Sequence, residues 1–203
     1  GEMTEDRIIS FLNDQVEGEF GEACLVRQLM DGEVISEKAN RALIKESSRR
    51  KLGLVQLHLA AALQKIPVQQ RSPLAYQLIV ESAFANDPQL PLLIWYGFEP
   101  AAAENPSFAI GVGFNTKMPA IRRLVARRVT EELATNPDSA FVLAATLEKR
   151  EDDYRLDVLE GMSQALRGLR RAPAPTNLAE GAAVLAKSHR ANATTSAHKH
   201  SFA

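Results

Sequence analysis

The sequence is poor in the residue types that most often hold cofactors or cross-link a small fold. Cys24 is the single cysteine among 203 residues, which excludes an intrachain disulfide, a thiolate zinc site and a Cys-x-x-Cys-His haem attachment. Aromatic residues make up only 6% of the chain, whereas alanine and leucine are abundant, and this balance favours helices over sheets. A chain of this length buries a core without cross-links, so we expect a globular protein.

Long hydrophobic runs and catalytic motifs are also missing. The longest apolar run, residues 90–98, is well short of the roughly 20 residues that a membrane-spanning helix needs, and it contains Pro91 and Gly97. The sequence therefore predicts a soluble chain without a transmembrane segment. It contains no phosphate-binding loop, nucleophile elbow or zinc-protease motif. We accordingly expect no enzyme activity and predict no catalytic residue, cofactor or metal ligand.

The spacing of apolar residues predicts a series of helices separated by proline, glycine and aspartate. No segment alternates apolar and polar residues over the length of a strand, so the predicted fold class is all-α. Residues 90–99 are apolar nearly all round and are predicted to end at Pro100 and to be buried on every side. The predicted helices cover residues 4–13, 23–30, 36–46, 50–65, 72–85, 90–99, 106–114, 118–134, 138–150 and 152–168, with a weaker one at 178–188.

The strong helices recur at an interval that is typical of repeat proteins. They begin near residues 51, 91, 119 and 153, roughly 30 to 40 residues apart, which is the period of helical-hairpin solenoids. We therefore predict a HEAT-like α-solenoid of stacked antiparallel helix pairs, with a non-repetitive helical bundle as the alternative. The predicted domains are a loop-rich lead-in with one helix (1–35), the helical array (36–172), a Pro/Ala linker with a possible last helix (173–190) and a disordered tail (191–203).

One string in the chain carries a resemblance to a known family. The sequence DPQLPLLIWYGFEP at residues 87–100 resembles a signature of the HEAT-repeat region in large membrane-bound dehydrogenases with haem-c domains from planctomycete-type bacteria. Residues 57–67 are similar to the repeat that precedes this signature, and residues 121–128 and 159–168 are similar to the repeats that follow it. The resemblance extends over residues 36–175.

The resemblance implies a structural role rather than a chemical one. Proteins of that family join a β-propeller domain, the helical array and a C-terminal haem-c domain. This chain has neither propeller strands nor a haem motif, so the family's redox activity is not carried over to any of its residues. What the resemblance implies is a non-catalytic scaffold or protein-binding module. Such a module would be a structural subunit or a fragment of a larger envelope-associated redox assembly, located in the periplasm or cell envelope and partnered by other subunits.

Four residues form the candidate partner-binding surface: Trp95, Tyr96, Arg123 and Arg127. Trp95 and Tyr96 are adjacent, so on a helix their side chains point about 100° apart and cannot clamp a ligand from one face. Core packing is the favoured interpretation of this pair, and a platform made by one ring is the alternative. Arg123 and Arg127 share a helix face opposite Leu124, and we expect both to face solvent.

Neither sign of charge dominates the chain as a whole. It has 24 basic and 25 acidic residues, which does not favour nucleic acid or an anionic membrane as a partner. The distribution is uneven, because residues 1–116 contain 10 basic and 15 acidic residues and residues 117–203 contain 14 basic and 10 acidic ones. The basic cluster at residues 122–128 therefore supports an alternative, a nucleic-acid-binding HEAT-like protein similar to a DNA glycosylase.

Overall fold

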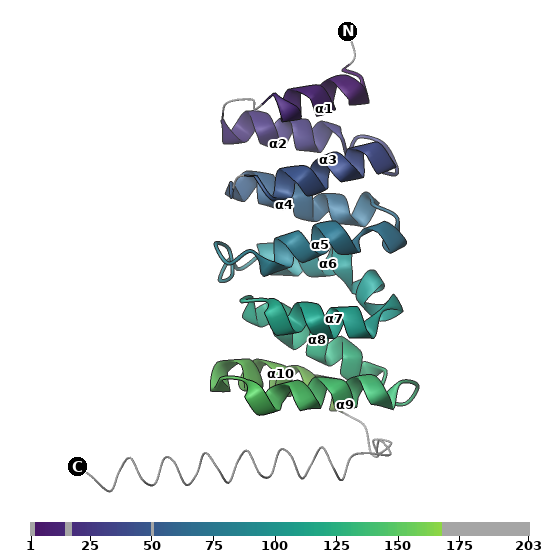
Figure 1. Ribbon diagram of the computed structural model, residues 1–203, viewed down its shortest axis with the longest axis vertical. Coiled ribbons are helices and arrows are strands. Elements are labelled where there is room, and N and C mark those ends of the chain that lie inside the picture. The colour runs from purple at the N-terminus through teal and green to yellow at the C-terminus, as the bar shows by residue number, and fades with distance from the viewer. Residues whose placement is uncertain (1–2, 15–17, 50, 168–203) are drawn as a thin grey trace, which may run out of the picture. The chain divides into compact units, whose positions relative to one another are not determined.

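The computed structural model describes residues 3–14, 18–49 and 51–167, and every regular element in these ranges is a helix (Figure 1). The prediction of an all-α fold is therefore confirmed for the described residues. The predicted helix at 178–188 and the predicted tail lie outside them. The α-helices are α1 (Glu5–Asn13), α2 (Glu19–Gln28), α3 (Glu37–Ser47), α4 (Gly53–Ala62), α5 (Ser72–Val80), α6 (Leu90–Glu104), α7 (Pro106–Asn115), α8 (Pro119–Glu131), α9 (Pro137–Thr146) and α10 (Asp152–Leu166). Three short 3-10 helices, η1 (Leu63–Lys65), η2 (Val68–Gln70) and η3 (Leu147–Lys149), complete the set.

The chain divides into two compact units. Unit 1 comprises residues 1–121 and unit 2 comprises residues 122–203. In unit 1 each helix from α1 to α5 packs on the helix two places further along the chain. One layer runs from α1 through α3 and α5 to α7, and the other runs from α2 through α4 to α6 (Figure 1). The predicted lead-in, residues 1–35, supplies α1 and α2 to these layers.

Local sequence signals start several of these helices. Ser36, Asn105 and Asn136 each occupy an N-cap position, and the side chain of each accepts a hydrogen bond from the backbone N–H three residues later. The predicted cap Thr4 occupies the N-cap position of α1 but does not cap with its side chain. Its carbonyl accepts from the N–H groups of Arg7 and Ile8.

The predicted end of the helix at Pro100 is wrong, because α6 continues to Glu104. Proline lacks the N–H that would bond the carbonyl of Tyr96 one turn earlier, and this normally breaks a helix. Burial beyond the proline offsets that loss, because Ala101 and Ala102 pack inside unit 1. The guanidinium of Arg71 donates to the neighbouring carbonyl of Gly97 at 2.9 Å.

Close packing between helices depends on two glycines. A Cβ at Gly97 would lie 2.3 Å from the Cβ of Leu63, so only glycine lets α6 approach the end of α4 this closely. In unit 2, a Cβ at Gly161 would lie 2.1 Å from the carbonyl oxygen of Arg123. The absence of a side chain at Gly161 therefore brings α10 against the backbone of α8, and this contact positions the charged groups described next.

Candidate functional site

Trp95 and Tyr96 have different surroundings on α6. Trp95 is 8% exposed, and its ring meets Phe98 edge to face with ring centroids 6.1 Å apart. The ring of Tyr96 is at the surface, with 67% of the residue exposed. Of these two candidates, only Tyr96 offers its side chain to a partner.

Arg123 is half-buried rather than fully solvent-facing as expected. Its Nη1 lies 2.6 Å from Oδ1 of Asp157, and Nη1 of Arg122 lies 3.2 Å from the other carboxylate oxygen of the same residue. A longer ion pair of 3.8 Å joins Arg123 to Glu160. The close crossing of α8 and α10 at Gly161 brings these acidic groups to the two arginines, and the spacing of residues along α8 alone cannot reveal it.

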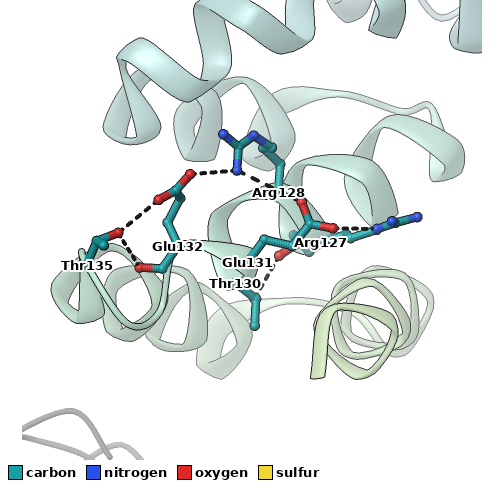
Figure 2. Close-up of polar contacts among 7 residues, drawn as sticks. Arg127, Arg128, Thr130, Glu131, Glu132 and Thr135 are labelled. Atoms are coloured by element: carbon teal, nitrogen blue, oxygen red, sulfur yellow. Dashed lines mark hydrogen bonds and ion pairs between the residues drawn. The ribbon is translucent and has the colours of Figure 1, made fainter. Parts of the chain in front are cut away.

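Arg127 lies on the exposed face of α8, as expected, and it also has an acidic partner. Arg127 pairs with Glu131 at 2.8 Å and Arg128 pairs with Glu132 at 2.7 Å, and both pairs are drawn in Figure 2. The hydroxyl of Thr135 donates to the carboxylate of Glu132 at 2.8 Å. This bond and the adjacent guanidinium of Arg128 lower the pKa of Glu132, so its carboxylate stays ionised to lower pH than an ordinary glutamate.

The ion pairs change what the basic cluster offers to a partner. Each of the four arginines at residues 122–128 has a carboxylate within 4 Å, from α10 or from the end of α8. A phosphate backbone would have to compete with these carboxylates, which reduces the gain from counterion release that drives nucleic-acid binding. The electrostatic signal that favoured nucleic acid is therefore weaker in the fold than in the sequence.

Unit 1 exposes large apolar side chains on α2, α4 and α6, of which the sequence analysis singled out only Tyr96. The four residues are exposed to different extents: Phe20 by 74%, Leu54 by 37%, Leu92 by 42% and Tyr96 by 67%. We call these four residues the apolar row. The prediction that residues 90–99 are buried on every side is wrong, because Leu92 and Tyr96 lie on a face of α6 that no described helix of unit 1 covers.

A sequence signal for the apolar row exists in hindsight. Phe20 and Leu54 are the second residues of α2 and α4, and Leu92 is the third residue of α6. The three are therefore separated by 34 and 38 residues, within the recurrence interval of the strong helices. Because α4 and α6 are apolar on all sides, their composition does not indicate which side faces solvent.

A second exposed apolar feature lies in unit 2. A shallow pocket on α10 is lined by Leu159, Met162, Ser163, Leu166 and Arg167. Leu156, on the same helix, is also exposed. The pocket contains no acid–base pair or cluster of polar groups that would recognise a small molecule.

The described residues contain no group of three or more histidine, cysteine, aspartate or glutamate side chains placed to hold a metal ion. None of the described helices is long and apolar enough to cross a lipid bilayer. Comparison of the chain with family models, with curated proteins and with solved structures finds no match.

Proposed function

We propose that this protein is a non-catalytic helical-repeat scaffold of the HEAT-like solenoid type that binds another protein through the apolar row. The observation that carries the proposal is the recurrence of exposed apolar side chains at Phe20, Leu54 and Leu92, one on each of three neighbouring helices. The alternate-helix packing of unit 1 supports the repeat architecture. Contiguous exposed apolar residues mark interaction surfaces in globular proteins more often than isolated ones do.

The size of the apolar row sets a limit on the affinity it can supply. Complete burial of a leucine or phenylalanine side chain is worth about 1.5–3 kcal/mol. The exposed fractions of the four side chains amount to about two whole side chains, so covering them contributes about 3–6 kcal/mol. Association itself costs about 4–15 kcal/mol. A stable complex therefore needs polar or charged contacts around the row as well.

The wider setting of the proposal comes from the resemblance at residues 87–100. On that basis the chain is a structural subunit, or a fragment, of a larger envelope-associated redox assembly whose chemistry resides on other domains. The apolar row includes Leu92 and Tyr96 of that string, and this overlap supports a common role for the string and the row.

The test is native mass spectrometry of the chain isolated from its own source at low salt, with an absorption spectrum of the same sample. We expect a stoichiometric protein partner that is lost in Leu92→Glu and retained in Val142→Glu. Val142 is a matched control, since it is an apolar helical residue with 50% exposure and lies in unit 2. A bare monomer, or a partner that both variants retain, would refute the proposed role of the row. Haem absorption from the partner would support the redox setting.

Nucleic-acid binding is the competing proposal, and it has its own test. DNA titration at low salt would show binding that weakens with added salt and in the double variant Arg123→Ala, Arg127→Ala. Because both side chains are ion-paired, we expect no such binding. A salt-sensitive affinity that depends on these two arginines would replace the scaffold proposal.

A further inference from the structure

The helices that carry the apolar row lie side by side in one layer of unit 1 (Figure 1). A carboxylate oxygen of Glu19, the first residue of α2, accepts a hydrogen bond of 2.7 Å from the backbone N–H of Leu54. At the other end of α4, the guanidinium of Arg71 bonds the carbonyls of Gln64 and Gly97 and so ties the end of α4 to α6. The first contact brings the starts of α2 and α4, with Phe20 and Leu54, next to each other, and the second brings the end of α4 beside Gly97, five residues after Leu92 on α6.

The apolar row offers few hydrogen-bonding groups to a ligand. Among its four side chains only the hydroxyl of Tyr96 is polar, and the described part of unit 1 contains no strand to which an extended peptide could add. An extended segment on this surface would leave its backbone N–H and C=O groups without protein partners. A helix satisfies those groups internally and presents only side chains, so the surface suits a helical ligand.

The spacing of the row specifies the pattern of that helix. Packed helices lie about 8–10 Å apart, so the row presents an apolar side chain at about this interval across α2, α4 and α6. An α-helix rises 1.5 Å per residue, and residues seven apart share a face about 10.5 Å from one another. A helix crossing the three would therefore contact them with apolar residues repeated every seven positions.

Negative charge at the edge of the apolar row favours a ligand helix with basic residues on its polar face. Glu19 and Asp87 are both exposed there, and the charge of Glu81 is offset by its ion pair with Lys51 at 2.8 Å. The backbone N–H groups of Leu90 and Gln89 donate hydrogen bonds to the carboxylate of Asp87 and lower its pKa further below neutral pH. Unit 1 as a whole has 15 acidic and 11 basic residues, which favours a basic ligand.

We propose that the apolar row binds a basic amphipathic helix of a partner protein, with apolar side chains seven residues apart over α2, α4 and α6 and lysine or arginine beside Glu19 and Asp87. This inference rests on the proposed function, because it names the partner class for the same surface. A second copy of this chain and a ligand of another charge are the alternatives that the experiment distinguishes.

The experiment uses the full chain and three synthetic helical peptides of about 18 residues, long enough to cross three packed helices. The first has leucines seven apart and lysines on the other faces, the second replaces the lysines by glutamates, and the third scrambles the first. Fluorescence anisotropy at low salt should show that the basic striped peptide binds at least tenfold more tightly than the other two. If the scrambled peptide binds as tightly as the basic striped one, charge attraction alone explains the binding. If the acidic peptide binds more tightly than the basic one, the surface prefers a ligand of negative charge. Either result would overturn the inference.

Variants of the chain locate the binding. Leu92→Ser should lower the affinity for the basic striped peptide at least fivefold, whereas Val142→Ser should leave this affinity unchanged. Glu19→Gln and Asp87→Asn remove charge but keep an oxygen that can accept the same backbone hydrogen bonds. The double charge variant should weaken binding at low salt and have little effect at high salt. Unchanged affinity in Leu92→Ser, with the fold verified by circular dichroism, would contradict the assignment of the surface.

Two further outcomes separate this inference from the proposed function. If no peptide binds but native mass spectrometry finds a partner that Leu92→Glu removes, the proposed function stands and the basic-helix inference fails. If sedimentation of the chain alone shows a dimer that Leu92→Ser dissociates, a second copy occupies the row and the inference is overturned.

Discussion

Replacement of Gly161 by alanine should destabilise unit 2 by about 1–2 kcal/mol. The new Cβ would lie 2.1 Å from the carbonyl oxygen of Arg123, 3.0 Å from its carbonyl carbon and 2.9 Å from the Cβ of Ala126. None of these atoms is the end of a flexible side chain, so α8 and α10 must separate. Overpacking of this kind costs about 1–3 kcal/mol, from which up to about 1 kcal/mol of improved helix propensity is subtracted. The separation would also lengthen the ion pair between Arg123 and Asp157.

The same substitution at Gly111 is the matched control. Gly111 lies in the interior of α7, and no atom lies within 4 Å of the position its Cβ would take. Gly111→Ala should therefore stabilise the protein by about 0.5–1 kcal/mol through helix propensity and a less flexible unfolded chain. Urea unfolding, with hydrogen exchange followed separately in α7 and α10, measures both effects. If Gly161→Ala were as stable as the unmodified chain, with the protection of α10 unchanged, the close crossing of α8 and α10 would be refuted.

Three further predictions concern charged groups. Asp157→Asn should lower the free energy of unfolding by about 2 kcal/mol, because it removes the carboxylate charge that Arg122 and Arg123 share; an unchanged thermal midpoint would contradict this pairing. Arg71→Ala should lower the free energy of unfolding in urea by about 2–3 kcal/mol, since the carbonyls of Gln64, Ile66 and Gly97 lose their donor. The stability of Arg71→Lys should lie between that of the unmodified chain and that of Arg71→Ala. Hydrogen bonding to Lys51 lowers the pKa of Glu81 in the folded state, so its stabilisation is present above the unfolded value of about 4.3 and is lost as the pH falls through the folded value. The free energy of unfolding should therefore fall less steeply with decreasing pH in Glu81→Gln than in the unmodified chain. The same pH dependence in both would refute the lowered pKa of Glu81.

The helices whose starts were predicted best are those that depend on their own residues. Ser36 caps α3 at the predicted position, and Pro106 and Asp152 begin helices where the sequence places them. Capping side chains and first-turn prolines act over three or four residues, so their effect is visible without any tertiary information. The same local rule fails at Pro100, because the residues that follow the proline on α6 are buried in unit 1.

The candidate site was predictable only in part. Trp95 is buried, as the favoured interpretation of the pair predicted, whereas Tyr96 is exposed against that interpretation. Arg127 is exposed as expected, but Arg123 is held by Asp157. A helical wheel predicts which residues share a face, yet it does not indicate which neighbouring helix covers that face. For an all-round apolar helix such as α6, this choice depends entirely on packing.

By itself the sequence determined the helical class and most helix positions, because apolar periodicity, caps and prolines act within a few residues. It also excluded disulfide and haem attachment by its single cysteine. Only the tertiary structure decided which apolar residues remain exposed on α2, α4 and α6, and that Asp157 of α10 pairs with Arg122 and Arg123. Both outcomes depend on contacts between residues about 30 or more positions apart, such as Arg123 with Asp157 and Gly97 with Leu63, and helix periodicity contains no information about such distances.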